Sequence, residues 1–237
     1  MIFLLLAAGE GTRLRPLTEV IPKCLLPVLG KPILGRWIDQ IFTFSDAKIF
    51  VNTHYKSREV SDFLTKSYPH NEDIQTIYEP TLLGTAGTLI SLFEDQQEDV
   101  IAIHVDNFSE VDLEEFVSVF ENLEDGRALA ATFKTDNYRN SGMVEIDGQH
   151  IIQSYVHKPN HSYLNDANAG LYAFPKAVLE KLELEKKRPL DISVDVLPKL
   201  MGRINAFRIK GVHIDIGTDL ETYQNLDSYL RLHGVNS

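Results

Sequence analysis

Apolar and polar residues follow two alternating patterns along the first half of the chain. Near-continuous apolar or β-branched runs predict four buried strands, at Ile2–Ala8, Lys48–Tyr55, Ile74–Tyr78 and Val100–Asp106. Between the first two runs, residues 33–42 repeat apolar positions at helical spacing. Buried strands separated by helices indicate a mostly parallel sheet covered on both faces. We therefore predict an α/β fold with three α/β/α layers and a mixed, mostly parallel central sheet.

The second half has more strand patterns and fewer helical ones. The predicted strands are Arg127–Thr135, Met143–Ile146, His150–His157, Ala169–Phe174 and Ile204–Ile216. They would extend the sheet and build a small β-rich lid. A capping box of Thr218 and Glu221 predicts a final helix. We expect one domain over 1–237, with halves at about 1–125 and 126–217 and a C-terminal helix over 218–237.

Composition and charge narrow the class of protein. Of the 237 residues 43% are hydrophobic and 24% charged, which is typical of a soluble globular protein. The net charge of −11 argues against nucleic-acid binding. Residues 1–40 nevertheless carry five basic and three acidic residues. A positive pocket on an acidic protein suits a small polyanionic ligand.

The apolar start of the chain could alternatively be a secretory signal. No basic residue precedes Ile2, however, and the run is far shorter than the roughly 20 residues that span a bilayer. The single cysteine, Cys24, excludes an internal disulfide. We expect a cytoplasmic protein without membrane attachment.

The predicted first strand leads into a glycine-rich loop, GEGTRL at 9–14. Leu14 replaces the third glycine of a dinucleotide fingerprint, and no Walker spacing is present. Gly9 and Gly11 would let backbone N–H groups approach an anion, while Arg13 and Lys23 add positive charge. A plain turn is the alternative on these residues alone.

A longer stretch around this loop resembles the signature of the sugar-1-phosphate nucleotidyltransferases. It covers 6–18 (LAAGEGTRLRPLT), 22–23 (PK) and 26–28 (LPV). The resemblance implies a Rossmann-like fold in which the strand end and loop bind a nucleoside triphosphate. The residues implied in nucleotide binding here are Leu6, Ala8, Gly9, Gly11 and Thr12. Arg13 and Lys23 would be catalytic, Arg13 on the departing pyrophosphate and Lys23 on the reacting phosphates.

Segment 79–88 (EPTLLGTAGT) resembles the base-recognition segment of the same family. The resemblance implies nucleotide contacts from Glu79, Gly84, Thr85 and Gly87. The alternative is a turn that opens a helix from about Thr88 to Phe93.

Two aspartates at predicted strand ends match the positions that hold Mg²⁺ in this family. Asp106 follows the run 100–105, and Asp215 lies in HIDIGT at 213–218. Carboxylate oxygens suit a hard cation, and a cation that bridges phosphates needs few protein ligands. The usual Gly-Asp pair is Val105-Asp106 here, and a turn or cap role is the alternative for a lone aspartate.

The sugar-phosphate residues match less completely. The resemblance implies binding by Gly142, His157, Lys158 and Asn168. His157 stands where the family has glutamate before Lys-Pro, and Ser193, in DISVDVLP at 191–198, replaces a second glutamate. The loss of two carboxylates places the usual hexoses in doubt, and His157 could equally be a structural histidine.

These residues together predict a Mg²⁺-dependent nucleotidyltransferase that joins a nucleoside triphosphate to a sugar 1-phosphate. The pattern is closest to mannose- or heptose-1-phosphate guanylyltransferases, so GTP is slightly favoured over UTP or dTTP. The resemblance implies nucleotide-sugar supply for polysaccharide biosynthesis, and a homo-oligomer is compatible with the sequence. The alternatives are a cytidylyltransferase for a non-sugar phosphate such as phosphocholine and a catalytically silent regulatory subunit.

Overall fold

The computed structural model describes residues 1–69, 71–123, 126–161, 164–184 and 189–235. The chain forms two compact units, each assembled from separate stretches. Unit 1 contains Met1–Ile2, Leu83–Ile103 and Glu110–Gly211, whereas unit 2 contains Phe3–Leu82, His104–Ser109 and Val212–Ser237. Because the units interleave along the sequence, the single domain with contiguous halves stays a prediction.

Unit 2 contains the strands that lead to the glycine-rich loop. β1 (Ile2–Leu6), β4 (Lys48–Thr53) and β5 (Ile74–Tyr78) follow one another in the sheet, and β4 and β5 run parallel. β1 carries an unbroken apolar sequence because its first four residues are fully buried. Because β4 and β5 run parallel, their carboxyl ends lie at the same edge of the sheet.

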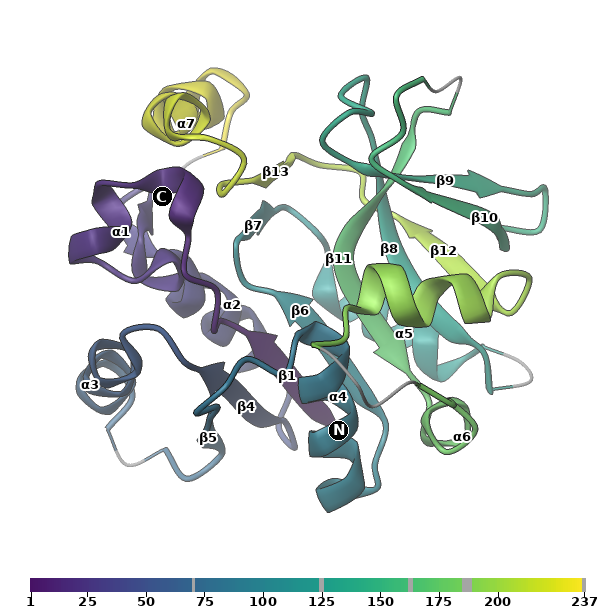
Figure 1. Cartoon of the computed structure of the whole chain (residues 1–237), viewed down its shortest axis with the longest axis horizontal. Helices are drawn as coiled ribbons and strands as arrows, with labels where there is room; N and C mark the ends of the chain where they lie inside the picture. Colours follow the sequence, from purple (N-terminus) through teal and green to yellow (C-terminus); the bar gives the residue numbers. More distant parts are fainter. Residues whose placement is uncertain (70, 124–125, 162–163, 185–188, 236–237) are drawn as a thin grey trace. The chain divides into compact units, whose positions relative to one another are not determined.

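Helices and short strands complete unit 2 (Figure 1). The helices are α1 (Leu17–Val20), α2 (Ile33–Ile41), α3 (Ser57–Ser67) and α7 (Leu220–Leu232). The short strands form two antiparallel pairs, β2 (Pro27–Val28) with β3 (Lys31–Pro32) and β7 (Asn107–Ser109) with β13 (His213–Asp215). The apolar face of α2 is buried, and its Trp37 indole N–H donates to the Asn107 carbonyl at 3.0 Å. The start of β7 is thereby fixed to α2.

Unit 1 contains β6 and the strands of the second half up to β12. These strands are β6 (Val100–His104), β8 (Ala128–Lys134), β9 (Gly142–Ile146), β10 (Ile152–His157), β11 (Asp166–Phe174) and β12 (Ile204–Arg208). The last residue of β6, His104, is assigned to unit 2. β11 pairs antiparallel with β6, β8 and β9, β9 pairs antiparallel with β10, and β12 runs parallel to β8 (Figure 1). Parallel and antiparallel pairs combined with helices confirm the predicted α/β class with a mixed sheet.

The described helical elements of unit 1 are α4 (Thr85–Gln96), α5 (Leu113–Glu121), α6 (Lys176–Leu179), a π-helical turn, Ile192–Val196, and a 3₁₀ turn, Leu197–Leu200. The helix expected from about Thr88 begins at Thr85, because Gly84 adopts a φ of +78° immediately before it. The single strand expected at 204–216 was wrong in its length. It divides into β12 and β13, since pairing with β8 stops after Arg208.

The final helix has a different cap from the predicted one. The Asp219 carboxylate, not the Thr218 hydroxyl, accepts a hydrogen bond from a first-turn amide, that of Thr222 at 2.7 Å. Thr218 instead donates its hydroxyl to the Asp215 carbonyl at 3.0 Å. The capping box of Thr218 and Glu221 was therefore wrong by one residue, and Thr218 belongs to the turn that follows β13.

In the described part of the chain, no helix is both long and apolar enough to cross a bilayer.

Candidate active site

The glycine-rich loop of unit 2 turns sharply at Gly11. Its φ is +64°, and a Cβ there would lie 2.7 Å from Thr18 Cγ2 and 3.0 Å from Lys23 Cβ. The Thr18 hydroxyl also donates to the Gly11 carbonyl at 2.9 Å. Residues 12–14 then form a 3₁₀ turn in which Thr12 and Arg13 are exposed. Glycine at position 11 therefore allows the exposed loop to pack against the Lys23 segment.

The first residues of the loop are held by Asn52, which our sequence analysis did not select. Its side-chain oxygen accepts from the amides of Ala7 at 2.6 Å and Ala8 at 3.2 Å, directly after Leu6. Its side-chain nitrogen donates to Glu79 Oε1 at 2.9 Å. Asn52 and Glu79 are only 4% and 2% exposed. A polar residue inside the apolar run 48–55 was the available signal, because buried polar groups require partners.

This geometry gives Glu79 a role in the protein itself. Its carboxylate bonds to Asn52, and its carbonyl lies 2.7 Å from His54 Nδ1. A nucleotide contact by Glu79 stays a prediction, but one carboxylate oxygen is already used to orient Asn52.

We expect Asn52→Ala to lower the free energy of unfolding by about 2–4 kcal/mol, because it removes three buried hydrogen bonds, one of them to a carboxylate. Urea denaturation monitored by circular dichroism measures this change. Asn140→Ala is the control, since Asn140 is exposed and should change stability by less than about 0.5 kcal/mol. Equal stability of the two variants would contradict the role of Asn52.

Asp106 and Asp215 meet in unit 2 although they are far apart in sequence. Asp106 lies in the turn between β6 and β7 rather than in a strand, and Asp215 ends β13. Pairing of β13 with β7 places Asp215 opposite Asn107, and the Ile216 amide donates to the Asp106 carbonyl at 2.9 Å. The Val105 amide donates to the Leu6 carbonyl, so the Asp106 turn also adjoins the end of β1.

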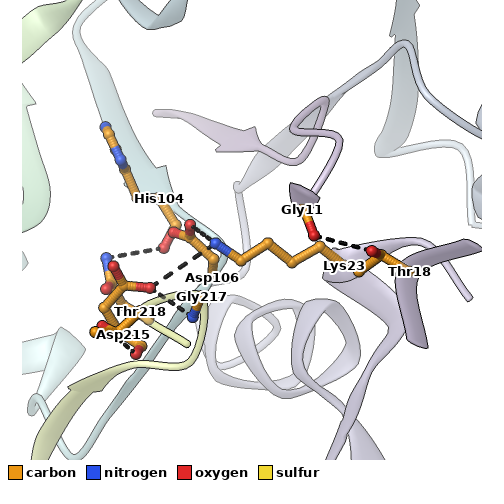
Figure 2. A network of polar contacts seen from close by, with 9 residues as sticks. Gly11, Thr18, Lys23, His104, Asp106, Asp215, Gly217 and Thr218 are labelled. Carbon is orange, nitrogen blue, oxygen red and sulfur yellow. Dashed lines mark hydrogen bonds and ion pairs between the residues drawn. The ribbon is translucent and has the colours of Figure 1, made fainter. Parts of the chain in front are cut away.

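Lys23 extends to both carboxylates (Figure 2). Its ammonium forms a hydrogen-bonded ion pair with Asp106 and lies 3.8 Å from Asp215 Oδ1. The Lys23 side chain is only 11% exposed. Gly217 leaves the space for it, because a Cβ at that position would overlap Lys23 Nζ. A cationic group thus already occupies the position between the two aspartates.

Burial and neighbouring charges shift the pKa values of the two carboxyl groups in opposite directions. Burial acts to raise the pKa of Asp106, but Lys23 and His104 outweigh it and hold that pKa below the usual value. Burial, followed by the Asp106 charge, raises the pKa of Asp215, against opposing effects of Lys23 and Arg13. The opposing effect of Arg13 indicates that its charge acts on Asp215.

These residues fit a divalent cation. Two carboxylates around an ammonium form an anionic site for positive charge, and Mg²⁺ commonly binds through one or two carboxylates plus substrate phosphates. Within the described part of the chain, no cluster of three or more His, Cys, Asp or Glu side chains could enclose a metal by itself. Any metal here would therefore need ligands from a bound substrate or water.

In unit 1, the predicted base-recognition residues begin α4. Gly84 packs so closely on Leu190 that a Cβ would overlap its backbone, and the Ala86 amide donates to the Leu190 carbonyl at 2.9 Å. At Gly87, a Cβ would lie 2.9 Å from Leu83 Cβ. The Thr85 hydroxyl donates to Asp191 at 3.2 Å. This segment is thus attached to the one that contains Ser193.

The predicted sugar-phosphate residues lie on β9, β10 and β11 of unit 1, with Lys158 directly after β10. His157 pairs with Gly142 between β10 and β9, and both His157 and Lys158 are exposed. Asn168 lies on β11, which also pairs with β9.

Two tyrosines that the sequence analysis did not select accompany these residues. A Cβ on Gly142 would overlap the Tyr155 ring, so glycine is needed there for packing. The Tyr155 hydroxyl lies 3.1 Å from His157 Nδ1. Asn168 Nδ2 donates to the buried Tyr172 hydroxyl at 2.6 Å.

Comparison with known proteins now establishes the family. The family model described as "Nucleotidyl transferase" matches residues 2–227, so the chain belongs to this family. A putative mannose-1-phosphate guanyltransferase from Sulfolobus acidocaldarius is 32% identical over 90% of this chain and 59% of that protein. The chain thus spans less than two thirds of the length of this curated relative.

Solved structures support the same family. HddC from Yersinia pseudotuberculosis has a TM-score of 0.78 and 28% identity, over 97% of this chain and 99% of that one. A second HddC structure contains GMP-PN, at a TM-score of 0.77 and 27% identity over 97% and 99% of the two chains. A putative glucose-1-phosphate thymidylyltransferase from Bacillus anthracis, at a TM-score of 0.83 and 22% identity over 98% and 96%, shows the same fold.

Proposed function

We propose that this protein transfers a nucleotidyl group from a nucleoside triphosphate to a sugar 1-phosphate. The observation that carries the proposal is the Lys23 ammonium held between Asp106 and Asp215 beside the glycine-rich loop. This combination of an exposed glycine-rich loop, cationic side chains and paired carboxylates suits a triphosphate and its counter-ion. The nucleotidyl transferase family and its sugar-phosphate relatives support the same reaction class.

In the proposed reaction, an oxygen of the acceptor phosphate forms a bond to the α-phosphorus, while the bond from the α-phosphorus to the bridging oxygen of the β-phosphate breaks. Pyrophosphate leaves with that electron pair. The acceptor phosphate is already ionised, so no side chain has to remove a proton. The protein acts through positioning and charge stabilisation.

The residues of unit 2 divide this task. Amides around Gly9 and Gly11 bind the triphosphate, and the exposed Arg13 stabilises the departing pyrophosphate. Lys23 compensates the charge of the aspartates and of the reacting phosphates. When bound to Asp106 and Asp215, Mg²⁺ supplies positive charge that reduces repulsion between the two anionic substrates.

The residues of unit 1 bind the acceptor. Lys158 and His157 are exposed at the end of β10, where their side chains can contact the phosphate. Asn168 and Ser193 contribute uncharged polar groups for the sugar hydroxyls. The absence of glutamate at 157 and 193 favours an acceptor other than the usual hexoses.

We infer that GTP is the preferred donor. The Sulfolobus relative is named as a guanyltransferase, and HddC was crystallised with GMP-PN. These are properties of related proteins, and they give guanine priority over uracil, thymine and cytosine in the first assay.

Pyrophosphate release in the presence of Mg²⁺ tests the proposal. Each of GTP, UTP, dTTP and CTP is combined with mannose, heptose and glucose 1-phosphates and with phosphocholine. We expect release with GTP and a sugar 1-phosphate. Release only with CTP and phosphocholine would assign a different acceptor class, whereas nucleotide binding without release across a wide acceptor panel would indicate the silent regulatory subunit.

A further inference from the structure

The hydroxyl of Thr85 is committed to contacts inside unit 1. It accepts a hydrogen bond from the Ile192 amide at 2.8 Å and lies 3.2 Å from Asp191 Oδ2, to which it donates. A hydroxyl has one proton, and here that proton is directed to Asp191. Thr85 therefore uses its only donor on the protein rather than on a nucleotide.

Asp191 connects this hydroxyl to the turn that carries Ser193. Its second carboxylate oxygen accepts from the Ser193 amide at 2.7 Å and the Val194 amide at 3.3 Å. The Asp191 amide in turn donates to Asp195 Oδ2 at 2.7 Å. The carboxylate thus caps the π-helical turn Ile192–Val196 from outside, and the Thr85 hydroxyl orients the carboxylate.

Ser193 belongs to a cluster of uncharged polar groups with Tyr155, Tyr172 and Asn168. Its hydroxyl lies 3.4 Å from the hydroxyl of Tyr172, which also accepts from Asn168 Nδ2. Burial raises the pKa of Tyr155 to about 12, with a hydrogen bond to Ser193 acting in the opposite direction. Burial also raises the pKa of Tyr172, so both phenols stay neutral at physiological pH and act as hydrogen-bonding groups.

We propose that Thr85 and Asp191 are positioning residues that hold Ser193 in this hydroxyl cluster, and that the partly exposed members of the cluster, Tyr155, Asn168 and Ser193, recognise hydroxyl groups of the acceptor. The inference rests on the proposed transferase function. It assigns Thr85 to acceptor binding, although Thr85 lies in segment 79–88, which resembles a base-recognition segment. The acceptor class it indicates is a polyol phosphate with no charged group other than its phosphate, because the cluster itself carries no charge.

Steady-state kinetics of Thr85→Val tests the assignment, since valine keeps the shape and removes the hydroxyl. We expect the KM for the acceptor to rise roughly tenfold, as for a lost hydrogen bond to a charged group, while the KM for the triphosphate changes less than about twofold. Thr85→Ser should restore the acceptor KM. Thr76→Val makes the same chemical change at an exposed position of β5 and serves as the control.

Ser193→Ala provides a second measurement, because it leaves Thr85, the first residue of α4, unchanged. We expect it to raise the acceptor KM in the same way, and the double variant Thr85→Val/Ser193→Ala to be less than additive, because both changes disturb one contact. Circular dichroism establishes that each variant is folded.

The outcomes separate this inference from the proposed function. A wild-type protein without pyrophosphate release over the full panel would overturn the function. If the wild type is active and Thr85→Val raises the KM for the triphosphate instead, the Thr85 hydroxyl serves the nucleotide and the inference is overturned. Unchanged acceptor KM, an equal rise in both KM values, or additive double-variant effects would overturn it as well.

Discussion

Lys23→Met is expected to reduce kcat about a thousandfold, because the variant retains the length of the side chain and loses its charge. The Lys23 ammonium lies within 4 Å of both aspartates, and loss of one well-placed charge-stabilising donor typically costs about 10²–10³ in rate. Rapid-quench or pyrophosphate-release assays at saturating substrates measure the change. The KM values should change much less, because the charge acts mainly on the transferring phosphates.

A matched variant separates catalysis from general loss of charge. Lys31→Met removes an ammonium whose side chain is 41% exposed and pairs with Asp39, so its kcat should stay within about twofold of the wild type. Because Lys23→Met also leaves the half-buried Asp106 carboxylate without this partner, its stability should be measured by thermal denaturation with and without Mg²⁺. A fully folded Lys23→Met protein with wild-type turnover would contradict the catalytic assignment.

The first strand and the loop could be predicted from local sequence, whereas the two metal-candidate aspartates were identified through the family resemblance. An apolar run such as 2–6 has few alternatives to a buried strand, and Asp106 and Asp215 directly follow or end apolar segments. That these aspartates adjoin each other is a consequence of the β7–β13 pairing. Only the family resemblance linked them in the sequence, since no local pattern specifies pairing over a hundred residues.

Features that depend on tertiary contacts were not predictable in this way. The choice of Asp219 over Thr218 as helix cap follows from the turn that commits Thr218 to the Asp215 carbonyl. In the sequence, Asn52 and Tyr155 are polar residues within predicted strands, and nothing nearby identifies their partners. The fold brings the Ala7 amide to Asn52 and Gly142 to the Tyr155 ring. Local propensity decides which element forms, whereas side-chain partners across elements decide its ends and its functional groups.

Asp215→Asn is expected to raise the melting temperature while lowering kcat by about 10²–10³. Burial and the Asp106 charge raise the pKa of Asp215, so its ionised form is disfavoured in the folded protein. Asparagine keeps an oxygen for the Gly217 amide, which Asp215 Oδ1 binds at 2.7 Å, and removes the charge. The Asp215 side chain is 40% exposed, so solvent screening limits the gain in stability.

The pH dependence of this gain follows from the same shift. A raised pKa in the folded state means that ionised Asp215 lowers stability above that pKa, whereas below the unfolded-state pKa both states are protonated and the penalty vanishes. The difference in melting temperature between Asp215→Asn and the wild type should therefore be positive near pH 8 without metal and shrink as the pH falls toward 4.

Metal binding gives this prediction a second readout. Mg²⁺ that binds the folded wild type raises its melting temperature by mass action, and Asp215→Asn should lose most of that rise because one of two carboxylate ligands is gone. Glu221→Gln, at an exposed position in the first turn of α7, is the charge-matched control and should retain it. A destabilised Asp215→Asn protein with a full response to Mg²⁺ would show that Asp215 is a structural partner of Lys23 rather than a strained ligand for the cation.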